Sequence, residues 1–68
     1  MTDVPIRDEV IRLGQFLKLA NAVESGADVK QVLATETVTV NGEPESRRGR
    51  QLVKGDAVTL GAETFVVA

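Results

Sequence analysis

The fold is decided by one short stretch, Thr37-Val38-Thr39-Val40-Asn41-Gly42. Polar and apolar side chains alternate along its first four residues, which predicts a half-buried β-strand. The Asn-Gly pair is typical of a tight hairpin turn, because both residues tolerate the positive φ angles that such turns require. Residues 43–50 should therefore return alongside this strand. Pro44 and Gly49 predict that this returning arm is irregular and lies at the edge of a sheet.

The chain downstream of the arm predicts further strands. Leu52-Val53 is expected to return to the core, and a tight turn follows at residues 54–56. Polar and apolar residues alternate again over residues 57–60 and 63–67, on either side of a Gly-Ala pair, which predicts a closing hairpin. The side chains expected to point inward from this hairpin are Val58, Leu60, Phe65 and Val67.

Upstream of the decisive stretch, the apolar residues repeat with a period near 3.6, which predicts two helices. The first should cover residues 11–21. The second should cover residues 25–35, with Ser25 as its N-cap and Asp28 completing a capping box. A short polar turn joins them, so the helices should pack as a hairpin or corner. The residues expected to form their buried stripes are Leu13, Phe16, Leu17, Ala20, Val29, Val32 and Leu33.

Two details complete the expected fold. Gly14 is a poor helix former, which indicates either close packing against a neighbour or a frayed first turn. Residues 1–9 form a polar N-terminal extension in which Pro5 favours extended backbone, so a short edge strand is expected there. We therefore predict a single domain, residues 1–68, of the α+β class. In it two packed helices cover a small, mostly antiparallel sheet of three to five strands.

Composition excludes several classes of function. The chain has no Cys and no His, which excludes disulfides, thiolate nucleophiles, imidazole bases and the usual zinc sites. The ligand spacing of a calcium loop is absent, and no apolar run approaches the length of a membrane span. The acidic N-terminus is unlike a signal peptide. We therefore expect a cytoplasmic protein that is not an enzyme, holds no cofactor or metal and does not contact a membrane.

Charge is spread unevenly over a chain whose net charge is −2. Residues 46–55 contain four basic side chains and no acidic one, and three of the four are Arg. The planar guanidinium group donates paired hydrogen bonds that match a phosphate group, so this run indicates binding to an RNA backbone. The chain has no Tyr or Trp, and both Phe residues fit the core, which points to the shape of folded RNA rather than to stacked bases. A solvated loop paired with Glu43 and Glu45 is the alternative. Those two carboxylates are expected to be exposed with ordinary pKa values.

Several motifs together resemble a known family. They are Leu13-Gly14-Gln15-Phe16-Leu17-Lys18-Leu19-Ala20, Ser25-Gly26 with Lys30, Val38-x-Val40-Asn41-Gly42-Glu43, Arg47-Arg48-Gly49-Arg50-Gln51-Leu52 and Gly55-Asp56-x-Val58. In this order and spacing the chain, from about Ile11 to Val67, resembles the S4 RNA-binding domain. It is most similar to the short, free-standing bacterial S4-like proteins of the YaaA and YbcJ type. The resemblance implies an S4-like (αL-type) fold that holds RNA along its helices and the adjoining β-hairpin.

The resemblance also implies a partner and a set of contacts. The partner would be structured RNA, either ribosomal RNA or a ribosome-assembly intermediate, bound by a monomer that can dock on a ribosomal particle. Many S4 domains have Arg at the position of Gly26 and Gly at that of Glu36. The missing Arg, together with Asp28 nearby, shifts the expected contact to the arm at 47–50. The alternative is a protein-interaction module that uses a sheet edge or a charged surface. The implied RNA contacts are Arg12, Lys18, Lys30, Asn41, Arg47, Arg48, Arg50 and Lys54.

Overall fold

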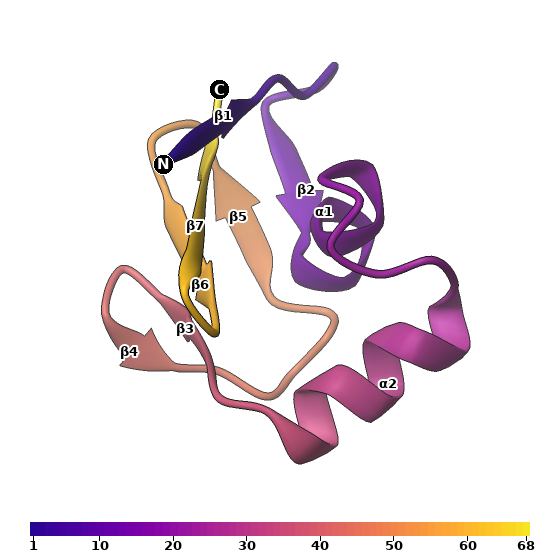
Figure 1. Ribbon diagram of the computed structural model, residues 1–68. Coiled ribbons are helices and arrows are strands. Elements are labelled where there is room, and N and C mark those ends of the chain that lie inside the picture. Colours follow the sequence, from indigo (N-terminus) through magenta and orange to yellow (C-terminus); the bar gives the residue numbers. More distant parts are fainter.

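Two helices, a five-stranded sheet and a two-stranded ribbon make up the computed structural model, which describes residues 1–68 (Figure 1). The sheet has the strand order β1-β7-β6-β3-β4, and β2 pairs with β5 in the ribbon. Every pairing is antiparallel except that of β1 with β7, so the predicted α+β class with a mostly antiparallel sheet is confirmed. In chain order the elements are β1 (Thr2–Val4), β2 (Val10–Arg12), α1 (Leu13–Leu19), α2 (Gly26–Thr35), β3 (Val38–Val40), β4 (Glu43–Pro44), β5 (Gln51–Val53), β6 (Ala57–Leu60) and β7 (Glu63–Val67).

Both predicted hairpins are present. Asn41 and Gly42 have φ angles of 53° and 86°, as the primed turns of two-residue hairpins require. The turn pairs β3 with β4, which contains Pro44 and forms an edge of the sheet as expected. The closing hairpin of β6 and β7 has the predicted bounds, and alternation places Val58 opposite Phe65 on its buried side. These contacts are local in sequence, which is why the pattern predicted them.

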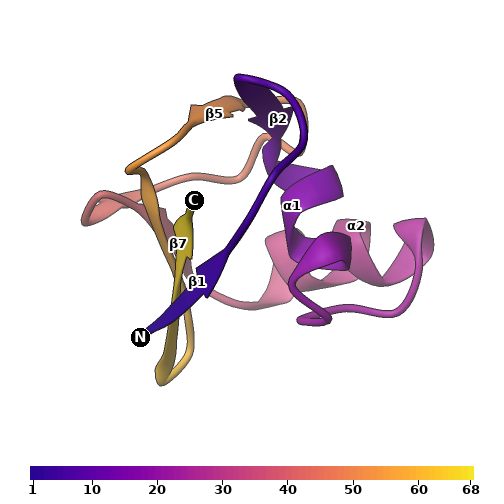
Figure 2. The same cartoon turned by 90° about the horizontal axis from the view of Figure 1, so that it is seen from above.

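The N-terminal extension supplies the other edge strand. β1 runs parallel to β7, with Val4 in register with Val67, and Val4 is buried. Backbone hydrogen bonds continue this pairing beyond the strands, because Ile6 N donates to Ala68 O at 3.0 Å and Ala68 N donates to Val4 O at 2.9 Å. The last residue of the chain therefore lies beside the N-terminal extension, next to the end of β1 (Figures 1 and 2).

The start of the first helix was predicted wrongly. Residues 10–12 form β2, whose Ile11 is in register with Leu52 of β5, and α1 begins only at Leu13. Pairing with a distant strand has overridden the helical period here. The expectation for Val53 was also wrong: alternation in β5 buries Leu52 completely and leaves Val53 49% exposed beside Val10 of β2.

The second helix has the predicted bounds and N-cap, but the capping box is incomplete because the Asp28 carboxylate accepts no hydrogen bond from Ser25 N. Its N-cap is Ser25, whose Oγ accepts a hydrogen bond from Asp28 N at 3.3 Å. Val29 is buried, and Val32 and Leu33 are half-buried against the core. The turn before α2 is less polar than expected, because Val23 is buried. Neither helix is long and apolar enough to cross a membrane.

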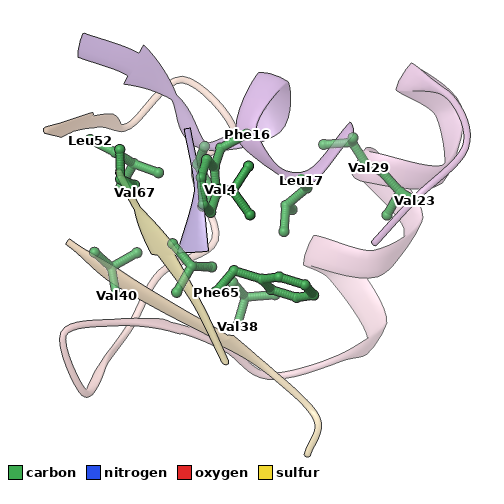
Figure 3. Close-up of a cluster of buried hydrophobic side chains, with 12 residues drawn as sticks. Val4, Phe16, Leu17, Val23, Val29, Val38, Val40, Leu52, Phe65 and Val67 are labelled. Carbon is green, nitrogen blue, oxygen red and sulfur yellow. The ribbon is translucent and has the colours of Figure 1, made fainter. Parts of the chain in front are cut away.

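The core lies between the helices and the strands, and its side chains are entirely hydrophobic (Figures 2 and 3). Phe16 and Leu17 reach it from α1, and Leu52 reaches it from the ribbon. Phe65 and its neighbours on the sheet close the other side. Both Phe residues are thus buried, as the sequence predicted. The core fixes α1, α2 and β5 relative to one another. Each of the two helices carries one Lys, and the arm at 47–50 leads directly into β5.

Candidate nucleic-acid interface

The segment between β4 and β5, residues 45–50, is called the arginine-rich arm below, and its path can be followed in Figure 1. It lies against the beginning of α1. Leu13 N donates to Arg50 O at 2.8 Å, and Gly14 N donates to Arg48 O at 2.9 Å. The first amides of a helix have no partner within the helix, and no side chain caps α1. The arm's carbonyls take that role, so the arm is fixed on the helix.

Gly14 makes this close approach feasible. A Cβ atom at this position would lie 3.3 Å from Arg48 Cβ and 3.3 Å from Val29 Cγ1. Three segments therefore meet at one point, namely α1, α2 and the arm. Of the two explanations offered by the sequence, close packing is the correct one, because Gly14 is buried within α1.

A shallow depression of about 260 Å³ opens beside this meeting point, and we call it the cationic hollow. Arg12 and Lys18 border it from the α1 side, and Arg48 borders it from the arm. No carboxylate lines it. Its remaining lining residues are Gly14, Gln15, Gly26, Val29 and Gly49.

A second depression adjoins the first across Arg48. It is bordered by Lys30 and Ala34 of α2 and by Ser46 of the arm, again with no carboxylate. Four predicted contact residues are therefore brought together by three separate segments. They are Arg12, Lys18, Lys30 and Arg48.

Arg47 and Arg50 instead share one carboxylate, that of Glu45. Arg47 Nε and Nη2 lie 3.1 Å from Oε2 and 3.2 Å from Oε1, and Arg50 Nη1 lies 3.5 Å from Oε1. The backbone amides of Ser46 and Arg47 also donate to Oε2, each at 3.1 Å. The neutralised loop considered from the sequence thus describes Arg47 and Arg50, whereas Arg48 forms no ion pair.

This cluster changes the ionisation of Glu45. Hydrogen bonds from the Arg47 guanidinium, and next from the Arg47 backbone amide, lower the pKa of Glu45 to about 2. The carboxylate in turn raises the pKa of Arg47. The Glu45 side chain is only 9% exposed, while that of Arg47 is 77% exposed. The expectation of an exposed Glu45 with an ordinary pKa was therefore wrong. The sequence signal that could have corrected it was an acid placed two residues before an Arg.

Asn41 and Lys54 are not brought to the cationic hollow. Asn41 Nδ2 donates to Asp56 Oδ1 at 3.0 Å, and Asn41 Oδ1 accepts from Ala57 N at 2.9 Å. This side chain therefore ties the β3–β4 turn to the turn before β6. Lys54 follows β5 while Arg50 precedes it, so the two lie at opposite ends of that strand (Figure 1).

Fold and surface together define the class of protein: the chain belongs to the S4 domain family, whose model matches residues 4–68. The resemblance seen in the sequence motifs is thereby confirmed. The chain is also similar to a particular short protein, the probable ribosome maturation protein RlbA of Bacillus subtilis (strain 168). The two are 49% identical over 57 residues, which cover 84% of this chain and 80% of that protein.

Proposed function

We propose that this chain binds structured RNA, and that its target is ribosomal RNA or a ribosome-assembly intermediate. The observation that carries the proposal is the gathering of Arg12, Lys18, Lys30 and Arg48 around two adjoining depressions that no carboxylate borders. This arrangement belongs to a chain whose net charge is −2, so it does not follow from a general excess of basic residues. Membership of the S4 domain family supports RNA as the ligand. The ribosome maturation protein among its relatives supports the ribosomal target.

In this proposal the basic side chains hold phosphates and the fold sets their positions. Arg48 offers a planar fork with no competing ion pair, and Lys18 and Lys30 add point charges from the two helices. Arg47 is exposed enough to contact a further phosphate with the donors that Glu45 leaves free. Because the helices and the arm are packed on one core, RNA would meet a preformed surface. Binding needs no cofactor, and we assign no catalytic step.

The placement of the aromatic residues indicates that RNA is recognised by its shape rather than by stacking of its bases. Phe16 and Phe65 are buried in the core, and the chain has no other aromatic side chain. Proteins that read unpaired bases commonly stack them on exposed aromatic rings. We therefore expect the ligand to be a folded RNA recognised mainly through its backbone.

A pair of double variants tests the proposal. Lys18→Ala with Arg48→Ala removes two cations from the cationic hollow, and Arg7→Ala with Lys54→Ala removes one Lys and one Arg elsewhere. Both doubles have the same net charge. We expect the first to lose at least about tenfold in affinity for purified bacterial ribosomal RNA, and the second to lose less than about threefold. Equal losses would mean that the surface is wrongly assigned. No binding by the unmodified protein would overturn RNA binding itself.

Crosslinking in cells, followed by sequencing of the attached RNA, tests the target. Enrichment of ribosomal RNA segments over messenger and transfer RNA is the expected result. Recovery of a protein partner from nuclease-treated lysate, resistant to high salt, would instead favour the protein-interaction alternative. Sheet-edge pairing is poorly supported at β4, because that strand has two residues and one is Pro44.

A further inference from the structure

One uncharged hydrogen-bonding side chain borders the cationic hollow, and it is Gln15. Gln15 precedes Lys18 by three residues, a spacing that places the two side chains on the same side of α1, and Arg12 is the residue directly before this helix. All three side chains are exposed and line the same depression. From the end of β2 into α1 the hollow is therefore bordered by a cation, a carboxamide and a second cation in that order.

This order matches the backbone of a nucleic acid, in which one sugar lies between every two phosphates. A carboxamide both donates and accepts hydrogen bonds, and so does the 2′-hydroxyl that distinguishes ribose from deoxyribose. We propose that Gln15 determines specificity for RNA over DNA by hydrogen bonding to the 2′-hydroxyl of a nucleotide whose flanking phosphates contact Arg12 and Lys18. The inference rests on the proposed function and extends it to the choice of sugar.

Two glycines leave open space at the border of the hollow. A Cβ atom at Gly26 or at Gly49 would meet nothing within 4 Å, and neither residue has a left-handed φ angle. Packing and backbone conformation therefore require glycine at neither position, in contrast to Gly14. Gly26 even lies in the first turn of α2, where Ala would be a better helix former. What the two residues share is that both border the hollow, so a side chain added at either would occupy open space at its border.

The first test compares Gln15→Ala with Gln31→Ala, a change on α2 away from the hollow. The probes are fluorescein-labelled RNA stem-loops that together cover ribosomal RNA, and the DNA stem-loop with the sequence of the tightest binder, measured by fluorescence anisotropy. We expect the unmodified protein to prefer the RNA. Gln15→Ala should weaken RNA binding about two- to tenfold and leave DNA binding unchanged. Gln31→Ala should change neither.

The outcomes separate this inference from the proposed function. If the unmodified protein binds none of the RNA stem-loops, RNA binding is wrong. If it binds RNA but Gln15→Ala changes RNA and DNA binding equally, or changes neither, the role of Gln15 is wrong while RNA binding stands. The role of Gln15 is also wrong if the unmodified protein binds the RNA and DNA stem-loops equally well.

The second test fills the hollow. Gly26→Leu and Ala27→Leu place the same side chain at adjacent exposed positions in the first turn of α2, but only residue 26 borders the hollow. We expect Gly26→Leu to lose about tenfold or more in RNA affinity, and Ala27→Leu to stay close to the unmodified protein. Circular dichroism should show both variants folded. A folded Gly26→Leu variant that binds RNA normally would mean that no nucleotide enters the hollow.

Discussion

The three arginines of the arm have unlike surroundings, and their effects on binding should differ. Arg47 and Arg50 contact Glu45, while Arg48 faces the cationic hollow without an ion pair. We expect Arg48→Ala to reduce RNA affinity about ten- to a hundredfold, as loss of a charge-assisted hydrogen bond does. Arg47→Ala should cost less than about threefold. Anisotropy titrations at one salt concentration measure both, and the reverse order would show that Arg47, not Arg48, is the main contact.

Glu45 makes the stability of the folded chain depend on pH. Its pKa is about 2 in the folded chain, below its ordinary value of 4.5. Because folding lowers the pKa of Glu45, its ionised carboxylate stabilises the folded state. This stabilisation is fully present above the unfolded-state pKa of 4.5, and it is lost as the pH falls from there towards about 2. Melting temperatures measured across this range should therefore fall more steeply for the unmodified protein than for Glu45→Gln. Glu43→Gln, which removes a carboxylate without an ion pair, serves as the control. Parallel curves for the unmodified protein and Glu45→Gln would contradict the role assigned to Glu45.

At the residue scale, the sequence identified the kinds of side chain but not their pairing. The basic run and the cations of the helices could be named from the family motifs, and four of these residues do gather. Whether a given Arg is free depends on which backbone amides and guanidinium groups converge on Glu45, and that follows from the folded path of the arm. Gln15 carried no signal of its own, because its position beside Arg48 exists only in three dimensions.

At the scale of elements, the contact between α1 and the arm should be sensitive to one methyl group. Gly14→Ala would push a Cβ atom against Val29 Cγ1, which is buried in the core, and against Arg48 Cβ, whose backbone is hydrogen-bonded to α1. We expect a net loss of about 1 kcal/mol in unfolding free energy, because overpacking outweighs the gain in helix propensity. Urea denaturation measures this loss, and RNA affinity should fall with it as Arg48 shifts. A variant more stable than the unmodified protein would show that the arm can move aside.

Asn41 should contribute to stability, by joining two turns, rather than to RNA binding. Its side chain bonds Asp56 and the amide of Ala57, and its own φ angle is positive. Asn41→Ala should therefore lower the unfolding free energy by about 1–2 kcal/mol. The affinity of the folded protein for RNA should stay within about twofold. A large loss of affinity without a loss of stability would support the direct contact that the family resemblance implies.

Elements with local partners were the ones that could be predicted. The hairpin of β6 and β7 and the Asn-Gly turn are encoded in adjacent residues, and α2 begins where Ser25 provides its cap. The strand β2 could not be predicted, because Val10–Arg12 become extended only by pairing with β5, which lies much later in the chain. Burial of Val23 was missed for the same reason: it stands in a mostly polar turn between the helices, and the hydrophobic contacts that bury it form only in the folded chain.

At the scale of the whole molecule, binding should depend strongly on salt. If three or four phosphates are neutralised by the four gathered cations, affinity should fall roughly 20- to 150-fold for a fourfold rise in salt concentration. Titrations at several potassium chloride concentrations give the slope directly. The Lys18→Ala and Arg48→Ala double should flatten that slope, while the Arg7→Ala and Lys54→Ala double should leave it unchanged. A slope near zero would be incompatible with phosphate contacts as the main source of affinity.

The hydrogen bonds from Leu13 and Gly14 to the arm have a consequence for incomplete chains. They join the first helix to a segment synthesised much later, so the surface assembled around Arg48 is missing from any fragment that stops before the arm. A nascent chain that ends after its two helices would contain Lys18 and Lys30 but not the arm with Arg48 that lies beside them in the folded protein. A cut in the loop after β4 would break the covalent path from β4 into the arm, which would then be held on the first helix by these hydrogen bonds and by the pairing of β5 with β2.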